Sequence, residues 1–209
     1  MVTVSDRPTA KRVWGLFADL LDYPQETPIE LLRDCRTLTG AMSPDADARL
    51  AEFQAFAEEA TMGHLQEEYT RAFDMDETHS LYLGYHLLGE SYKRSALLLE
   101  FKERYRTYGI EVAGELADHL PVVLRFLAVC EDQEMANEIV GEGLWPMLDM
   151  MAKKDRKSEE AAADEEDHPP RVPRPYHGLL AALLAVVESV TMSDQQPLVI
   201  TGAAGRPTT

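Results

Sequence analysis

The chain has 209 residues, a net charge of −17 and a hydrophobic fraction of 45%. This length suits a single domain, and the hydrophobic fraction is sufficient for a buried core. A surface this acidic disfavours nucleic acid, which requires clustered Lys and Arg, and slows encounters with anionic membranes. It favours partners with basic surfaces; the alternative is that the charge only keeps the protein soluble.

The sequence indicates a soluble, cytoplasmic protein. Its two cysteines, Cys35 and Cys130, lie in apolar helical patterns and form no CxxC motif, which is typical of reduced core residues. The N-terminal residues lack the apolar segment of a secretory signal. The longest apolar run, residues 179–187, is too short to insert stably across a bilayer.

Apolar residues recur with helical spacing from the start of the chain. The first expected helix carries an apolar stripe made of Val13, Leu16, Phe17, Leu20 and Leu21. Thr27-Pro28 and Ser43-Pro44 each supply an N-cap and a proline for the first turn, so a helix is expected after each pair. Gly40 is expected to end the earlier of these two helices.

Helical spacing continues through Leu65, Tyr69 and Phe73 to an acidic break at residues 74–77. We then expect one long segment of helix over about residues 78–108, weakened or bent at its internal glycines and ended by Gly109. The residues expected to face inward from this segment include Leu81, Tyr85, Leu88, Tyr92, Ala96, Leu99 and Tyr105.

The next helix is expected to begin at Asp118, whose carboxylate would act as the N-cap. His119, Leu120 and Pro121 would form its first turn, where a missing N–H is tolerated. A further helix is expected over about residues 133–154, with a kink or break near Leu144 caused by Pro146.

Residues 153–175 combine a charged run with four prolines, and we expect them to form a mobile, extended linker. A last helix is expected over about residues 176–190. No segment alternates with period two for long enough to suggest a sheet. The sequence therefore predicts an all-α fold, a single-domain helical bundle over residues 1–193 with the linker before its last helix, followed by a flexible tail at 194–209.

Known catalytic and metal-binding patterns, such as HExxH, GxSxG and the Gly-rich phosphate loop, do not occur in the sequence. His79 and His86 are seven residues apart and could share a helix face, but a metal site needs further ligands in defined geometry. Capping or solvent-exposed histidines are the simpler interpretation. His64, His168 and His177 are scattered and carry no signal.

Asp118 and His119 could form the acid–base pair of a small hydrolase. Adjacent residues diverge by about 100° around a helix, however, and no Ser or Cys nucleophile is visibly paired with them. The spacing therefore favours a non-catalytic role. Glu90 and Arg94 are one helical turn apart and form either an exposed ion pair or the polar edge of a groove that binds another chain.

Four segments occur in an order that resembles a known family. They are Tyr69-x3-Phe73-Asp74, Ser80-Leu81-Tyr82-Leu83, His86-Leu87-Leu88-Gly89-Glu90-Ser91-x2-Arg94 and Glu115-x2-Asp118-His119-Leu120-Pro121-x2-Leu124-x2-Leu127. Over about residues 12–190 the chain resembles the delta-subunit family of respiratory nitrate reductases. These are the NarJ-type molybdenum cofactor assembly chaperones, part of the wider group of redox-enzyme maturation proteins.

The resemblance implies an all-helical monomer or weak dimer with no catalytic residues, no metal site and no cofactor of its own. Such a chaperone binds the N-terminal segment of the catalytic subunit of a molybdoenzyme and holds it open until the molybdenum cofactor is inserted. A helix-in-groove mode of binding fits this role. We expect the client-binding site to be lined or shaped by Tyr85, Glu90, Arg94, Asp118, His119 and Pro121.

Ser95, Ala117 and Arg125 depart from the family's usual residues and leave the client open. The client is a respiratory nitrate reductase or a related selenate, chlorate, dimethyl sulfide or ethylbenzene oxidoreductase. Further alternatives are a stably bound helical adaptor subunit and the small hydrolase. His119, a titrating residue at the expected groove, could make client release depend on pH.

Overall fold

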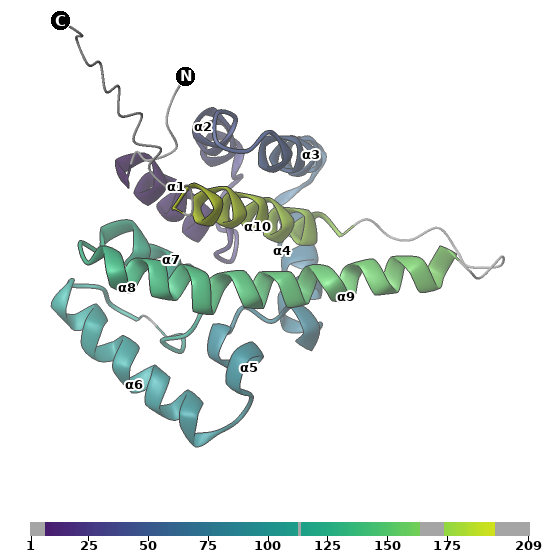
Figure 1. The fold of residues 1–209 in the computed structure, drawn as a ribbon. Helices are drawn as coiled ribbons and strands as arrows, with labels where there is room; N and C mark the ends of the chain where they lie inside the picture. Colours follow the sequence, from purple (N-terminus) through teal and green to yellow (C-terminus); the bar gives the residue numbers. More distant parts are fainter. Residues whose placement is uncertain (1–6, 113, 164–173, 195–209) are drawn as a thin grey trace, which may run out of the picture.

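The computed structural model describes residues 7–112, 114–163 and 174–194, which form helices joined by turns (Figure 1). The helices of the N-terminal half are α1 (Arg7–Leu20), α2 (Ile29–Thr39), α3 (Pro44–Glu59) and α4 (Met62–Tyr69). A π-helical turn, η1 (Thr70–Asp74), and a 3-10 turn, η2 (Glu77–His79), follow. The remaining elements are α5 (Leu83–Leu88), α6 (Tyr92–Thr107), α7 (Leu120–Val129), α8 (Gln133–Glu138), the π-helical η3 (Ile139–Leu144), α9 (Trp145–Ala163) and α10 (Pro175–Asp194).

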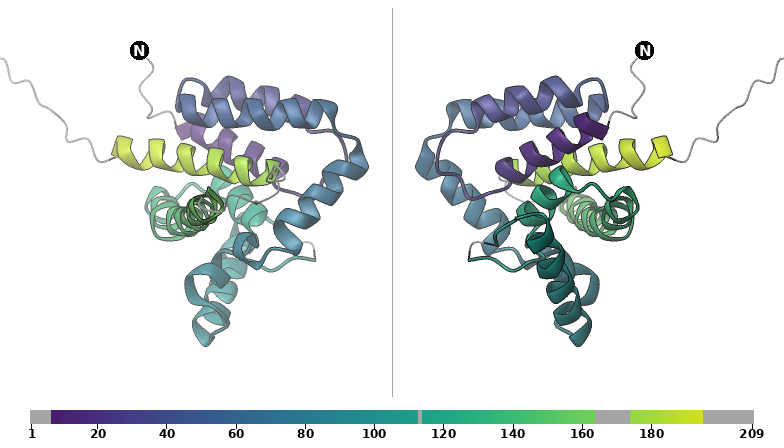
Figure 2. Two further views of the ribbon diagram at one scale, coloured as in Figure 1. Left: turned by 90° about the vertical axis from the view of Figure 1, so that its right-hand side faces the viewer. Right: turned by 90° about the vertical axis from the view of Figure 1, so that its left-hand side faces the viewer.

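The expected all-α fold is confirmed, since no strand forms within these residues apart from one isolated bridge between Tyr82 and His119. Figures 1 and 2 show a layered bundle in which α10 lies between α3 and α9. The short α5 and the longer α6 project from this body (Figure 2). The bundle therefore consists of a packed body and a smaller projecting part made of α5 and α6.

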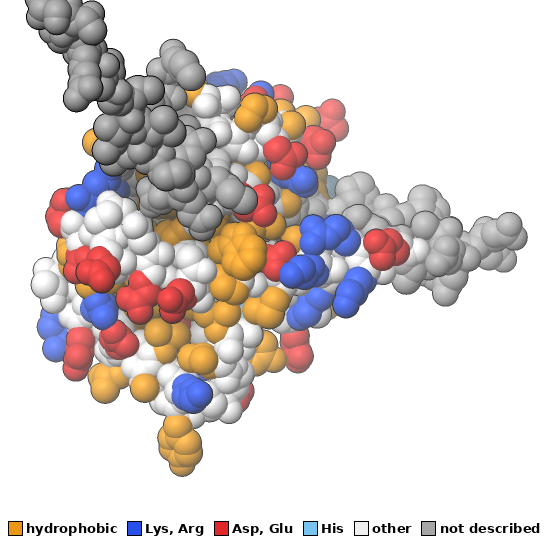
Figure 3. Space-filling view, viewed as in Figure 1, with side chains coloured by type: hydrophobic (Ala, Val, Ile, Leu, Met, Phe, Trp, Pro, Cys, Tyr) orange, Lys and Arg blue, Asp and Glu red, His pale blue; other side chains and the backbone are white. Residues whose placement is uncertain are grey.

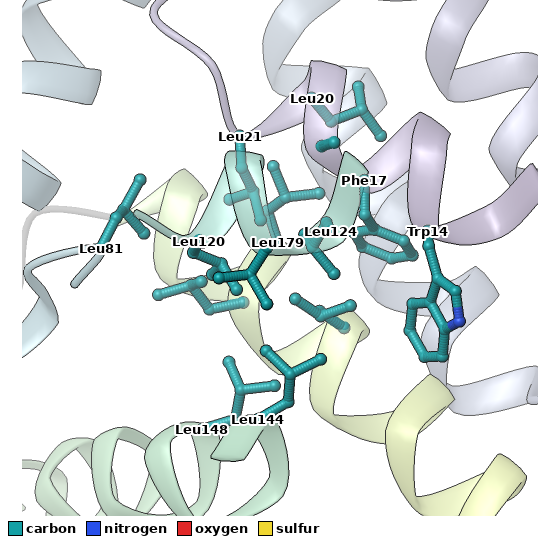
Figure 4. Packing of buried hydrophobic residues seen from close by; sticks show 14 of the residues in the cluster. Trp14, Phe17, Leu20, Leu21, Leu81, Leu120, Leu124, Leu144, Leu148 and Leu179 are labelled. Carbon is teal, nitrogen blue, oxygen red and sulfur yellow. The ribbon is translucent and has the colours of Figure 1, made fainter. Parts of the chain in front are cut away.

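The core forms where α1, α7, α10 and the start of α9 converge. Figure 4 shows its leucines and aromatic rings pointing toward one another, among them Phe17, Leu124, Leu148 and Leu179. Seven of the ten residues of α7 are buried, so this helix is enclosed on most sides. Tyr176 adds an aromatic cluster, with its ring 5.0–5.4 Å from the rings of Phe53, Tyr69 and Phe73.

Local signals explain where several helices begin. The Ser43 hydroxyl accepts a hydrogen bond from the Ala46 N–H at 3.3 Å, and Pro44 occupies the first turn of α3, as predicted. At α2 the expected cap is not formed, because Pro28 rather than Thr27 precedes the helix and makes no side-chain cap. Pro146 lies just after the π-helical η3, close to the predicted kink or break, and its missing N–H explains the disturbed hydrogen-bond pattern there.

The single long helix expected over residues 78–108 is wrong. Gly89 has a φ of +60°, which breaks the segment, and the Ser91 hydroxyl then caps a new helix by accepting a hydrogen bond from the Arg94 N–H at 3.4 Å. The restart shifts the helical phase. Tyr92 and Leu99, expected to face inward, are 97% and 60% exposed.

The linker expected over residues 153–175 is wrong for residues 153–163, which continue α9. This stretch is rich in Lys, Glu and Ala, all good helix formers, and Lys153 is paired with Asp149 one turn earlier at 2.6 Å. Residues 164–173 and the tail from 195 lie outside the described residues. The last helix packs back on α3 and α9 as α10.

Both cysteines are buried, as predicted for core residues. Burial raises the pKa of the Cys35 thiol to about 12, which keeps it in the unreactive thiol form. Among the described helices, none combines the length and apolar character that a bilayer span requires.

Two leucines allow a matched test of this packing. Leu124 is fully buried in α7, whereas Leu99 is 60% exposed on α6. We expect Leu124→Ala to lower the free energy of unfolding by about 2–5 kcal/mol, because it leaves a cavity in the core. Leu99→Ala is expected to change it by no more than about 0.5 kcal/mol. Urea unfolding followed by circular dichroism measures both, and equal losses would contradict the arrangement of α6.

Candidate functional site

A buried ion pair between Asp118 and Arg94 lies at the centre of the candidate site. Asp118 is fully buried, and the Arg94 guanidinium donates to its two carboxylate oxygens at 2.9 and 3.4 Å. The Gly84 N–H donates to the same carboxylate at 3.1 Å. One carboxylate therefore joins α5, α6 and the segment that enters α7.

The prediction that Asp118 caps α7 is wrong. The helix begins at Leu120, and the residue at its N-cap position is His119, which makes no side-chain capping hydrogen bond. The physical reason is that a buried carboxylate needs a cation and several donors, and here Arg94 and Gly84 supply them. The interaction with Arg94 is formed in place of the cap.

Backbone hydrogen bonds join the same two segments of chain. The Leu83 N–H donates to the Asp118 carbonyl at 2.9 Å, and the Leu120 N–H donates to the Leu81 carbonyl at 2.7 Å. Between these bonds Tyr82 lies opposite His119, with the ring centroids 5.2 Å apart. Residues 81–83 and 118–120 are thus held in a fixed register.

Two tyrosines flank the guanidinium of Arg94, whose central carbon lies 5.7 Å from the ring centroids of both Tyr82 and Tyr85. The Tyr82 hydroxyl donates to the Glu115 carboxylate at 2.7 Å. Burial and this contact raise the pKa of Tyr82 to about 12. Glu90 is 3.6 Å from Arg94 but 85% exposed, so this expected i, i+4 pair forms at the edge of the site and adds little stability.

An open groove of about 390 Å³ lies beside Arg94, and we call it the α6 groove. It is lined by Glu90, Ser91, Tyr92, Arg94, Ser95, Leu98 and Leu116. Tyr92 and Leu116 are 97% and 42% exposed, which is unusual for large apolar side chains. Figure 3 shows hydrophobic side chains gathered in the middle and lower part of the face that includes α5 and α6.

The structure brings most of the six predicted residues together. Glu90 and Arg94 line the α6 groove, and Tyr85 and Asp118 contact Arg94. The His119 ring lies against Tyr82 at the edge of this cluster, and Pro121 is buried in the first turn of α7. Sequence reasoning did not single out the groove residues Tyr92, Leu98 and Leu116. The exposure of Tyr92 and Leu98 depends on the helical phase set at Gly89, and Leu116 lies in the irregular segment before α7.

His119 is only 7% exposed, and within the described part of the chain its Nδ1 has no hydrogen-bond partner. Burial lowers the pKa of His119 below its ordinary value, and Arg125 acts in the same direction. The nearby carboxylates Glu115, Asp22 and Asp118 oppose this shift without reversing it. His119 is therefore a neutral, buried imidazole near neutral pH.

The histidines outside this site are arranged differently from the sequence expectation. His79 lies in η2 and His86 in α5, so the two do not share a helix face, and the His86 Nε2 is 2.7 Å from the Ser80 carbonyl. His79 instead stacks on His177, with centroids 3.7 Å apart. Nothing in the sequence signals this contact, since the two histidines are separated by nearly half of the chain.

The close approach of Gly84 to Asp118 gives a stability test. A Cβ at Gly84 would lie 2.7 Å from the Asp118 Oδ2, which cannot move away without losing Arg94. We expect Gly84→Ala to destabilise the fold by about 1–3 kcal/mol. Gly63→Ala is the matched control, because Gly63 is also in a helix and its added Cβ would meet no atom within 4 Å apart from its chain neighbours and the backbone of its own helix. The control is expected to be neutral or stabilising in urea unfolding; a similar loss in both would contradict the geometry.

The lowered pKa of His119 predicts a pH dependence of stability. Below about pH 6.5 the unfolded chain takes up a proton at this residue and the folded chain does not, so the free energy of unfolding falls as the pH drops toward the folded pKa. We expect His119→Gln to remove this contribution, which is at most about 1.4 kcal/mol per pH unit. Urea unfolding at several pH values measures it. His64→Gln is the control, since the His64 side chain is 51% exposed, and identical slopes for the two variants would contradict the assignment.

Comparison with known proteins gives the family. Residues 39–145, slightly more than half of the chain, match the family described as nitrate reductase delta subunit. NarW of Escherichia coli K12, assigned as a nitrate reductase molybdenum cofactor assembly chaperone, is 27% identical over 176 residues, which cover 84% of this chain and 68% of NarW. NarJ of the same organism, a nitrate reductase molybdenum cofactor assembly chaperone, is 29% identical over 90 residues, which cover 43% of this chain and 37% of NarJ.

The fold also has a solved counterpart. A crystal structure of a protein from Archaeoglobus fulgidus, proposed to be a redox enzyme maturation protein, matches with a TM-score of 0.50 and 21% identity over 90% of this chain and 97% of that one. NarW and NarJ are named as chaperones and not as enzymes, which agrees with the expectation that this chain has no catalytic activity. On the match to residues 39–145, this chain belongs to the nitrate reductase delta subunit family.

Proposed function

We propose that the chain is an assembly chaperone for a respiratory nitrate reductase or a closely related molybdoenzyme. It binds the N-terminal segment of the catalytic subunit and keeps that subunit competent for molybdenum cofactor insertion and complex assembly. It acts in the cytoplasm as a monomer or weak dimer. The observation that carries this proposal is the α6 groove. It lies beside the buried Arg94–Asp118 pair, and most of its lining residues belong to the segments that resemble the nitrate reductase delta-subunit family.

The chemistry of the groove suits an amphipathic client segment. Tyr92, Leu98 and Leu116 offer an apolar surface, and covering such surface stabilises a complex by about 25 cal/mol per Å² before the costs of association. Glu90 and Arg94 lie at its polar edge and can bind charged groups at the ends or sides of the client. A helix that inserts its apolar face into such a groove is a recurrent mode of peptide recognition.

The six residues predicted from the sequence divide into two roles in this proposal. Glu90 and Arg94 contact the client directly. The other four, Tyr85, Asp118, His119 and Pro121, shape the site by holding Arg94 or the start of α7 in place. The net charge of −17 favours a client segment whose polar face is basic, so binding weakens as salt concentration rises.

The hydrolase alternative lacks support from the geometry. The Asp118 carboxylate is fully buried and bound to Arg94 and Gly84, so it does not orient the His119 imidazole. His119 itself is 7% exposed and lies outside the lining of the α6 groove. A dependence of client release on the protonation of His119 would therefore act through the structure of the site and not through contact in the groove.

Calorimetric titration with synthetic N-terminal peptides of candidate molybdoenzyme catalytic subunits tests the proposal. Tyr92→Ala is expected to weaken binding about tenfold or more, because it removes the most exposed apolar side chain of the groove without affecting the core. Met75→Ala is the control, since Met75 is 77% exposed but lies outside the groove lining. Binding of no peptide on either side of the histidine titration range, or equal loss in both variants, would contradict the proposal.

A second experiment distinguishes a chaperone from an adaptor subunit. A chaperone leaves once the client has received its cofactor, whereas an adaptor stays in the finished complex. Retention of the chain on the cofactor-loaded enzyme during gel filtration would favour the adaptor.

A further inference from the structure

A second polar cluster lies away from the α6 groove, where η2, α9 and α10 meet. Its two imidazoles belong to His79 and His177, which are 2% and 8% exposed and stacked at 3.7 Å with their planes 25° apart. Asp155 of α9 reaches both of them, with 3.1 Å to the His79 Nε2 and 3.2 Å to the His177 Nδ1.

The contacts to Asp155 determine which nitrogens remain available. If each imidazole donates an N–H to this carboxylate, the lone pairs lie on the His79 Nδ1 and the His177 Nε2. The His177 Nε2 is buried and has no hydrogen-bond partner in the described part of the chain. The His79 Nδ1 lies 3.2 Å from the Asp76 Oδ2 and 2.8 Å from the Thr78 hydroxyl, whose one proton is donated to the Asp76 Oδ1. With that proton engaged, a lone pair on the His79 Nδ1 faces a carboxylate, which is unfavourable unless a cation or a proton lies between them.

We propose that Asp76, His79 and His177 bind a divalent cation of the zinc class. One potential ligand atom from each of the three residues lies within 4.8 Å of the other two. Two imidazole nitrogens and one carboxylate oxygen form a ligand set that Zn²⁺ prefers, and it leaves one position for water. Asp155 then serves as the outer carboxylate that fixes the orientation of both histidines, as is usual for metal-binding histidines.

The placement of the carboxylates suits a cation. The Asp155 carboxylate contacts both imidazoles, and the Asp76 carboxylate lies beside the His79 Nδ1.

Two adjustments accompany binding. Zinc–nitrogen bonds are about 2.0–2.1 Å long, so the stacked rings tilt until both lone pairs point at the ion. The Arg174 guanidinium, 3.1 Å from the Asp76 Oδ2 and 46% exposed, turns outward into solvent.

The neighbours of Asp155 on α9 are basic and exposed: Lys153, Lys154, Arg156 and Lys157. Lys and Arg side chains gather over this part of α9 in Figure 3. Asp155 is therefore the inward-facing acid of a basic stretch.

Titration of chelator-treated full-length chain, carrying no histidine tag, with Zn²⁺ and Co²⁺ near pH 8 tests the proposal. We expect one ion per chain, a higher Tm with Zn²⁺, and visible absorption bands of Co²⁺ in a nitrogen–oxygen site. His177→Gln and Asp76→Asn are expected to weaken Zn²⁺ binding about tenfold or more. His64→Gln, which changes a histidine outside the cluster, is expected to leave it unchanged.

Asp76→Asn keeps the test valid if His177→Gln fails to fold. The Asp76 side chain is 22% exposed, and Asn can still accept the hydrogen bond from the Thr78 N–H. Circular dichroism checks both variants. Absence of binding up to millimolar Zn²⁺ would overturn the proposal and leave a proton as the occupant of the cluster. Binding that is unchanged in His177→Gln and Asp76→Asn would overturn it as well. None of these outcomes depends on the client-binding role.

Discussion

The buried pair of Arg94 and Asp118 is the interaction on which the candidate site depends. Removing two charges from water is costly, and the cost is offset only when geometry and additional hydrogen bonds are good. Here the carboxylate accepts from the guanidinium and from the Gly84 N–H, and the guanidinium lies near the rings of Tyr82 and Tyr85. Every partner comes from α5, α6 or the segments directly before α5 and α7, so the pair fixes these elements relative to one another.

This arrangement connects the core to the groove. α7 is enclosed by the bundle, whereas α6 projects from it (Figure 1). Asp118 directly precedes the buried start of α7, and Arg94 lies in the first turn of α6. The buried charges therefore fix the start of α6 to the core, and the buried Phe101 and Tyr105 anchor the helix further along. A groove on such a helix keeps its shape while its apolar residues stay exposed for a partner.

The sequence predicted the fold well where the signals were local. The apolar stripe of α1, the Ser43 cap of α3 and the disturbance before Pro146 depend on residues within a turn or two of one another. The sequence prediction failed where a residue can make either of two interactions and a residue far away in the chain determines which one forms. The sequence predicts that Asp118 caps a helix, but in the structure it is bound by Arg94, 24 residues earlier. His79 and His177 gave no signal because only the packing of α10 brings them together.

The φ of +60° at Gly89 limits which residues this turn of the chain tolerates. Residues with a side chain rarely adopt this conformation, so the turn between α5 and α6 resists replacement and the direction of α6 is set by a single residue. Substitutions on the surface of α6 and at the facing Leu116 change the lining of the α6 groove without changing this turn. The chemistry of the groove can therefore vary while the direction of α6 stays constant.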